Sequence, residues 1–134
     1  MERVRHGVAE MVSGVVEVTA LESARAIIRS IHMEEKIMDY IVRISRATRN
    51  PEEFGLKIGP MVSYGASPRA SIWLGMAARA HAFMIGRGYV TPQDVKSMAP
   101  DVLRHRIILS YEAEAEGKTS DDLIQILLER IEVP

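Results

Sequence analysis

Apolar residues recur at intervals of three and four along most of this chain, and that periodicity restricts it to a mainly helical fold. The first such pattern predicts an amphipathic helix over residues 20–31, with Thr19 and Glu22 at the spacing of a capping box. A second predicts a helix over residues 34–49. Its expected inward face is Ile37, Met38, Ile41, Val42, Ile44, Ser45 and Thr48. We expect an all-α helical bundle, with room for one short β pair.

The middle of the chain predicts a long loop followed by the central helix. Residues 50–64 contain prolines and glycines without a sustained period, so we expect an ordered loop there. From Pro68 to Ile85 apolar residues occur nearly all round the helix, which predicts that it is the most buried one. Gly86 or Gly88 is expected to end it.

The C-terminal third predicts shorter elements. Thr91 and Pro92 are expected to start a short helix ending near Met98, and Pro100 to open another turn. Residues 107–109 suit a strand, which we expect to pair with residues 15–18. A loop over 112–118 should lead to a terminal helix capped by Thr119. The first 14 residues predict no element.

Composition is that of one soluble domain. The chain has 134 residues, of which 47% are hydrophobic and 26% charged, enough for a single core. A net charge of −1 argues against a general binder of nucleic acid or anionic membranes. The absence of cysteine excludes disulfides, thiolate catalysis and cysteine-ligated zinc. No long apolar run or signal-peptide pattern occurs, so we expect a cytoplasmic protein.

The segment Gly65-Ala66-Ser67-Pro68-Arg69-Ala70 predicts a site for an anion. Ser67 is a good N-cap and Pro68 suits the first helical position, which puts Arg69 in the first turn. A cation there is close to free backbone N–H groups and the positive end of the helix dipole, an arrangement that suits phosphate. The alternative is an arginine that simply points into solvent.

The sequence contains few other candidate catalytic or ligand-binding residues. The chain has neither a G-x-x-x-x-G-K-[ST] phosphate loop nor a hydrophobic strand ending in Asp-Glu, so it cannot be a complete ATPase. No metal site is predicted, because the histidines have neither an i,i+4 partner nor a cysteine companion. These histidines are His6, His32, His81 and His105, and His81 is expected to pack at the edge of the central helix. The acids Glu112, Glu114 and Glu116 suit a solvated loop.

Ordered motifs carry a resemblance to one family. The run from Tyr64 to Ser71 is followed by Gly88-Tyr-Val-Thr-Pro-Gln-Asp-Val95 and then by Ala99-Pro-Asp-Val-Leu-Arg-His-Arg-Ile107. Together with the run from Tyr111 to Gly117, they resemble the C-terminal lid domain of MoxR-type AAA+ ATPases. The resemblance runs from about Val18 to the C-terminus.

This resemblance implies a helical lid over 18–134 and a linker or tail from a preceding core over 1–17. Arg69 matches the second-sensor arginine, which in that family reaches the phosphates of ATP, with Ser67, Pro68 and Ala70 beside it. ATP and Mg would be held mainly by an N-terminal core. Such a chaperone-like parent is expected to form a homo-oligomeric ring, without nucleic acid or membrane as partner.

The chain lacks that core, so it is either a domain cut from a longer protein or a stand-alone remnant, and the weakly matching N-terminus favours the first. We expect neither tight ATP binding nor hydrolysis from it alone. Arg104, His105 and Arg106 are candidates for an interface with the core or a neighbouring subunit, or else simply complement a helix C-terminus. Arg79 and Arg87 are expected to be solvated. The alternative function is a helical protein-interaction module, or a DNA-binding one with a helix-turn-helix over 91–106.

Overall fold

The computed structural model describes residues 12–134, and the expected lack of structure over residues 1–11 therefore lies outside the described part. In chain order its elements are α1 (Val18–Ser30), α2 (Glu35–Ala47), the 3-10 turns η2 (Pro51–Phe54) and η3 (Gly59–Met61), β1 (Val62–Tyr64), α3 (Arg69–Met84), α4 (Pro92–Leu103), β2 (Ile108–Leu109), α5 (Tyr111–Ala115) and α6 (Ser120–Arg130). The predicted mainly helical fold with one short β pair is confirmed.

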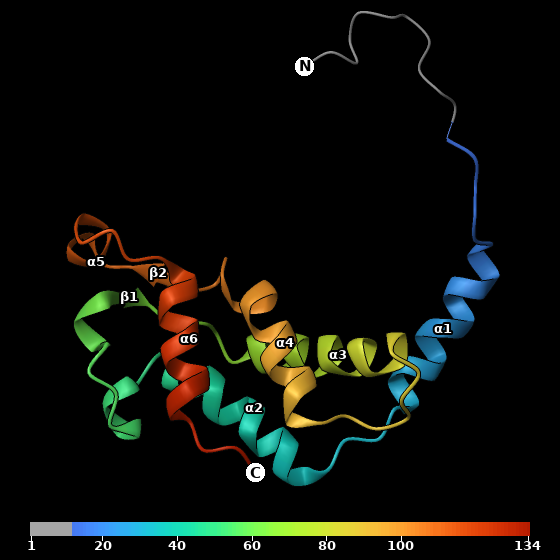
Figure 1. The fold of residues 1–134 in the computed structure, drawn as a ribbon, viewed down its shortest axis with the longest axis horizontal. Coiled ribbons are helices and arrows are strands. Elements are labelled where there is room, and N and C mark those ends of the chain that lie inside the picture. The colour runs from blue at the N-terminus through green and yellow to red at the C-terminus, as the bar shows by residue number, and fades with distance from the viewer. Residues whose placement is uncertain (1–11) are drawn as a thin grey trace, which may run out of the picture.

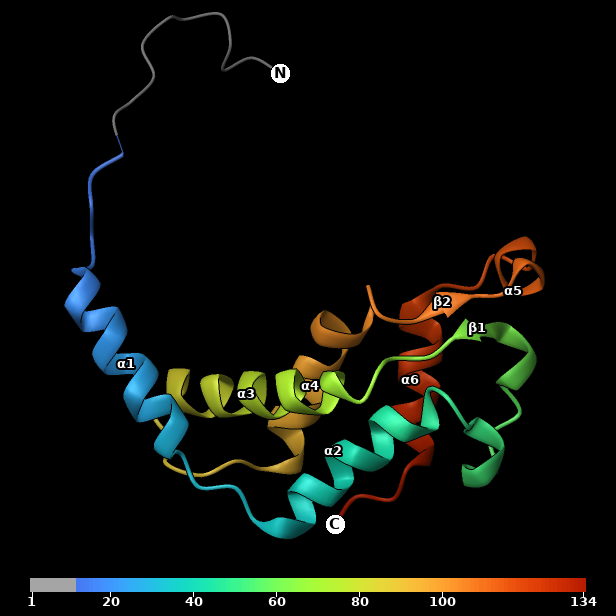
Figure 2. The ribbon, with the colours of Figure 1, turned by 180° about the vertical axis from the view of Figure 1, so that it is seen from behind.

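Helices α2, α3, α4 and α6 form the body of the molecule (Figure 1). Helix α1 lies at one end, and the β pair with α5 at the other, in both views (Figures 1 and 2). Side chains of α2, α3, α4 and α6 supply the centre of the core, where the largest fully buried ones are Tyr40, Ile44, Leu74, Leu103, Leu123, Ile124, Leu127 and Val95.

Helix α3 is central, but its large side chains do not fill the core. Its buried face consists of Leu74 and the small residues Ala70, Gly75, Ala78 and Ala82. Small residues let α3 pack closely against α2 and α4. Large residues of α3 are instead exposed, namely Ile72, Trp73, Met76 and Met84. The prediction that this is the most buried helix is therefore wrong, since five of the 16 residues of α3 are buried against six of the 13 in α2. Gly86, with φ of 77°, follows the helix as expected.

The inward face of α2 also differs from the prediction at individual positions. Its buried residues are Ile37, Tyr40, Ile41, Ile44, Ser45 and Ala47, and Thr48 follows them. Met38 and Val42, expected inside, are exposed. Compared with the predicted inward face, the buried face of α2 is therefore shifted toward Tyr40, a residue that the apolar periodicity did not place inside.

The short β pair joins segments other than those expected. Strand β2 pairs antiparallel with β1, with Val62 opposite Leu109 and Tyr64 opposite Ile108. The predicted pairing of residues 107–109 with residues 15–18 is wrong, since Val18 begins α1. Strand β1 lies within the stretch over 50–64 that was expected to be loop.

Helix α1 is amphipathic, yet none of its residues is buried. It begins at Val18 with Glu17 at the N-cap and no side-chain cap, so Thr19 lies inside the helix and the predicted capping box of Thr19 and Glu22 is wrong. Its C-terminal end is held by backbone bonds, since the His32 N–H donates to the Gly88 carbonyl at 3.0 Å and the His32 carbonyl accepts from Val90 at 2.9 Å.

Helix α4 is continuous through Pro100, so the expected break near Met98 does not occur. A proline inside a helix removes one backbone hydrogen bond. The buried residues Val95, Ala99 and Leu103 nevertheless repeat every four positions across Pro100, and they place one face of the helix against the core. The helix-turn-helix interpretation of residues 91–106 is wrong for the same reason.

The helix starts predicted at Thr91 and Thr119 are confirmed, and each has a capping box. Thr91 with Asp94 starts α4, and Thr119 with Asp122 starts α6. The expected loop over 112–118 contains a short helix, α5, because the Ser110 hydroxyl accepts a hydrogen bond from the Ala113 N–H at 3.2 Å. In residues 12–134 no helix is long and apolar enough to cross a membrane.

Candidate functional site

The loop before α3 is pressed against the end of α2 at Gly65. A Cβ atom built on Gly65 would lie 2.3 Å from the Thr48 carbonyl oxygen and 2.7 Å from the Arg49 nitrogen. Both are backbone atoms that cannot move aside. Only glycine fits this close approach, which brings the start of α3 against the end of α2.

One buried threonine ties this loop to α2. The Thr48 hydroxyl accepts a hydrogen bond from the Ala66 N–H at 2.9 Å and donates one to the Ser45 carbonyl at 2.7 Å. Arg49 Nη1 donates to the Ala66 carbonyl at 2.5 Å, and the Ser45 hydroxyl to the Ser67 carbonyl at 3.5 Å. These contacts fix where α3 begins. Ser45 and Thr48 were predicted on the inner face of a helix, but no pattern in the sequence indicated these contacts.

Arg69 is the first residue of α3, with Pro68 before it at φ −54° and ψ −27°. Pro68 has helical backbone angles but stands at the N-cap, so the prediction of Ser67 as N-cap and Pro68 as first helical residue is wrong, and the helix starts without a side-chain cap hydrogen bond. The Ala70 N–H donates to the Ser67 carbonyl at 2.9 Å and the Ser71 N–H to the Pro68 carbonyl at 3.1 Å. Fewer N–H groups are therefore free than the sequence suggested. Ala70 is buried, whereas Ser67, Pro68 and Arg69 are exposed.

The Arg69 side chain is available to a ligand. It is exposed, and within residues 12–134 its guanidinium takes part in no ion pair. A planar guanidinium on a rigid helix can offer two donors at once to phosphate or carboxylate oxygens. The structure therefore presents a cation at the place where the motif predicts one.

A buried carboxylate organises the connection from α3 to α4. The side chain of Asp94 is 1% exposed, and its Oδ1 lies 2.7 Å from His81 Nδ1. Its Oδ2 accepts from the Thr91 N–H at 2.7 Å, from the Thr91 hydroxyl at 2.9 Å and from Arg87. Burial raises the pKa of Asp94, but hydrogen bonds from Thr91, His81 and Arg87 outweigh it and leave the pKa below its usual value.

Sequence reasoning found only part of this cluster. Thr91 was expected at a helix start and His81 at the edge of its helix, but nothing in the spacing joined His81 to Asp94. The expectation that Arg79 and Arg87 are solvated is wrong. Arg87 binds Asp94, and Arg79 Nε donates to the Ile31 carbonyl at 3.1 Å.

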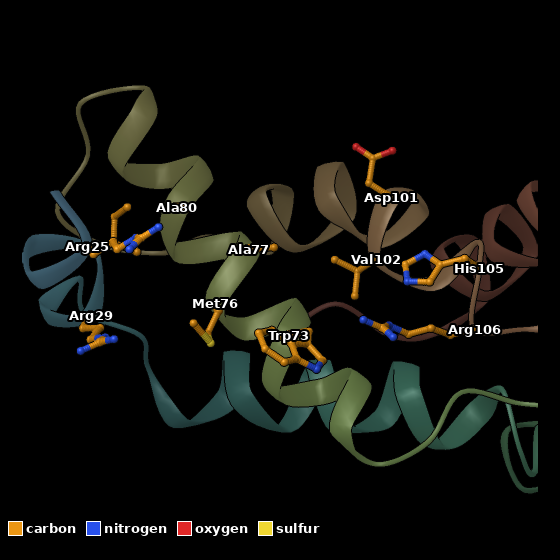
Figure 3. A pocket seen from close by; sticks show the side chains of 11 residues that line it. Arg25, Arg29, Trp73, Met76, Ala77, Ala80, Asp101, Val102, His105 and Arg106 are labelled. Carbon is orange, nitrogen blue, oxygen red and sulfur yellow. The ribbon is translucent and has the colours of Figure 1, made fainter. Parts of the chain in front are cut away.

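The candidate interface residues separate in space. Arg104 Nε lies 2.8 Å from Asp121 Oδ1, so it links α4 to α6, and this ion pair raises the pKa of Arg104. His105 and Arg106 instead line a groove between α1, α3 and α4 (Figure 3). Within the described residues no group of three His, Asp or Glu side chains could hold a metal ion.

Comparison with known proteins identifies the domain. The AAA lid domain family matches residues 57–127. The chain belongs to this family. The AAA lid domain is also 44% identical over 99 residues to "Chaperone MoxR1" of Mycobacterium tuberculosis, which covers 73% of this chain and 26% of that protein.

Further relatives extend the match. "Protein MoxR" of Methylorubrum extorquens is 31% identical over 133 residues, covering 93% of this chain and 38% of that protein. A crystal structure from Cytophaga hutchinsonii, of a protein assigned as an ATPase, superposes with a TM-score of 0.78 at 42% identity, covering 81% of this chain and 33% of that one. The lid domain is therefore homologous to MoxR-family proteins over most of its length and spans well under half of each.

Proposed function

We propose that this AAA lid domain works with an N-terminal AAA+ core and that Arg69 contacts the phosphates of ATP bound between them. The supporting observation is the exposed Arg69 guanidinium, free of ion pairs within residues 12–134, at the first residue of α3. The fit of Gly65 against Thr48 and the hydroxyl bonds of Thr48 hold that helix start in place. Such a rigid mount suits a residue whose position must report on a ligand.

In this proposal the core supplies the chemistry and the lid supplies the sensor. The core holds ATP and Mg, since this chain has no phosphate loop. When the γ-phosphate is present, Arg69 is drawn to it, and its helix carries the lid with it. Loss of the γ-phosphate removes that contact and lets the lid relax. Residues 1–17 would be the linker from the core, and 18–134 the moving body.

The parent protein in this proposal is a chaperone-like ATPase that assembles into a homo-oligomeric ring. The name "Chaperone MoxR1" and the ATPase assignment of the Cytophaga hutchinsonii protein support this class for the parent. Arg104, His105 and Arg106 remain candidates for contacts with the core or a neighbouring subunit. The exposed His105 suits such a contact better than Arg104, which already pairs with Asp121.

The test is Arg69→Ala in a polypeptide that joins a MoxR-type core to this lid. We expect ATP turnover to fall by about tenfold or more, because a charged hydrogen bond to phosphate is worth about 1.5–3 kcal/mol. The free energy of unfolding should change by less than about 0.5 kcal/mol, since the side chain is exposed.

The matched control is Arg130→Ala, which removes an exposed arginine from the last turn of α6. Its turnover should equal that of the unmodified protein. The 134-residue chain alone should show no hydrolysis above buffer. Unchanged turnover in the Arg69→Ala protein would refute the proposed role.

A further inference from the structure

A groove between α1, α3 and α4 has no occupant among the described residues. It has a volume of about 580 Å³ and is lined from all three helices and the segment after α4 (Figure 3). Its volume is within the range of binding pockets. The groove is open to solvent rather than enclosed, so a segment of another chain can enter it.

The floor of the groove is apolar. Ile28, Trp73, Met76 and Val102 line it, and Trp73 is 51% exposed although it is the only tryptophan of the chain. Helix α1 forms one wall, and none of its residues is buried despite its amphipathic sequence. A contiguous exposed apolar surface of this kind is unfavourable in water unless something covers it.

The rim is cationic. Arg25 and Arg29 of α1 stand on one side and Arg106 on the other. Within residues 12–134 none of these arginines forms an ion pair, and the buried Nε of Arg106 has no hydrogen-bond partner. These three side chains therefore carry positive charge that no ion pair among the described residues neutralises.

The one acid on the rim does not neutralise it. Asp101 points away from Trp73 and Arg106 in Figure 3, and its carboxylate lies 3.3 Å from Arg104 Nη1, outside the groove. The side chain of Arg106 reaches toward Trp73 in the same view. The Arg106 guanidinium and the Trp73 side chain therefore face the same space.

We propose that this groove binds an acidic amphipathic helix of a partner protein. Apolar side chains of that helix would cover Trp73, Met76 and Ile28, and its carboxylates would pair with Arg25 and Arg29. A further carboxylate would pair with the guanidinium of Arg106. This is the helix-in-groove mode of recognition, with the charges selecting the partner.

Charge and shape favour this occupant over the alternatives. A nucleic acid would need a longer basic track, whereas the chain carries a net charge of −1 and the groove floor is apolar. The acids of the chain's own α5 lie at the opposite end of the molecule (Figure 1), so they cannot fill the groove from within. The proposal requires no nucleotide and is independent of the role given to Arg69.

The experiment uses the fluorescence of Trp73 in the 134-residue chain, since this is the sole tryptophan. The probe is a synthetic peptide of about four helical turns, with leucines on one face and glutamates on the others. We expect saturable binding with a blue shift of the emission, weakened by salt. A peptide with lysine in place of every glutamate should bind at least tenfold more weakly.

Variants test the cationic rim. The double variant Arg25→Gln with Arg29→Gln should weaken binding of the acidic peptide about tenfold, because two ion pairs are lost. The matched control removes two cations outside the groove, by Lys118→Gln with Arg130→Gln, and should leave the affinity unchanged. Circular dichroism of both proteins checks that they retain their helices.

Several results would overturn the proposal. These are equal affinity for the acidic and lysine peptides, tighter binding of an oligothymidylate, or self-association of the chain that excludes the peptide. If ATP alone shifted the Trp73 emission and displaced the peptide, the groove would be a nucleotide site and the proposal would fail. The Arg69 turnover measurement is separate, so either proposal can fail while the other stands.

Discussion

At the scale of single residues, Asp94 shows how one buried charge can hold a turn. Its carboxylate is 1% exposed and takes hydrogen bonds from Thr91, His81 and Arg87. A charge removed from water is tolerated only when its oxygens are satisfied in this way. The carboxylate thereby joins the end of α3, the following turn and the first residues of α4.

We predict that Asp94→Asn lowers the free energy of unfolding by about 2 kcal/mol at pH 7, because hydrogen bonds to a charged group are lost. The folded-state pKa of Asp94 is depressed, so its contribution is complete above the unfolded pKa of about 3.9. It is lost as pH falls through the folded pKa, where the native state must take up a proton. Urea unfolding at pH 7 and in steps toward pH 3 measures this.

The difference between the two proteins should therefore shrink as the solution becomes acidic. Asp39→Asn, at an exposed position of α2, is the control and should change the stability by less than about 0.5 kcal/mol at any of these pH values. If the free energies of unfolding of Asp94→Asn and of the unmodified chain differed by the same amount at every pH, the predicted dependence on the ionisation of Asp94 would be wrong.

At the scale of helices, the N-termini of α3 and α6 are held in place in different ways. Helix α6 begins with a full capping box, in which the Thr119 hydroxyl accepts from the Asp122 N–H at 3.2 Å. Helix α3 has no side-chain cap and is held instead by bonds between its preceding loop and Thr48. Similar sequence signals, a hydroxyl residue before a helix, therefore have different structural roles.

We predict that Thr119→Ala lowers the free energy of unfolding by about 1 kcal/mol, the usual cost of losing an N-cap. Ser67→Ala, at the start of α3, should cost less than about 0.5 kcal/mol because no cap bond is lost there. Chemical denaturation of both variants at neutral pH gives the comparison. Equal costs at the two positions would show that Ser67 caps its helix after all.

At the scale of the whole molecule, buried side chains are unevenly distributed among the helices. Core residues come from α2, α3, α4 and α6, while α1 buries none of its side chains and lies at one end (Figure 2). Segments with few buried contacts open at lower free energy than the core does. Helix α1, which carries Arg25 and Arg29, is therefore held less strongly than the core helices α2, α3, α4 and α6.

We therefore predict that backbone amides of α1 exchange with deuterium at least about a hundredfold faster than those of α2 and α4 at neutral pH. Hydrogen exchange followed by mass spectrometry of peptides from each helix measures this. Adding the acidic peptide described above should slow exchange in α1 and not in α6. Protection of α1 equal to that of α2 in the free chain would show that α1 is part of the cooperative core.

Much of this architecture could be predicted from local pattern. The periodicity, the Thr91 and Thr119 capping boxes and the Gly86 stop depend on neighbours within one or two turns, so the sequence alone determined them. The same holds for the position of Arg69 in the first turn of its helix. Local hydrogen bonds and backbone preferences act wherever the segment lies.

Only the tertiary structure decided which apolar residues are buried and which distant groups meet. Met38, Val42 and Trp73 are as apolar as their buried neighbours, and only the packing of α2 against α3 and α4 leaves them exposed. The pairing of β1 with β2, the contact of Gly65 with Thr48 and the approach of His81 to Asp94 likewise join segments separated in the chain. Burial and long-range hydrogen bonds depend on how all the helices are placed relative to one another, and a local sequence pattern does not determine that placement.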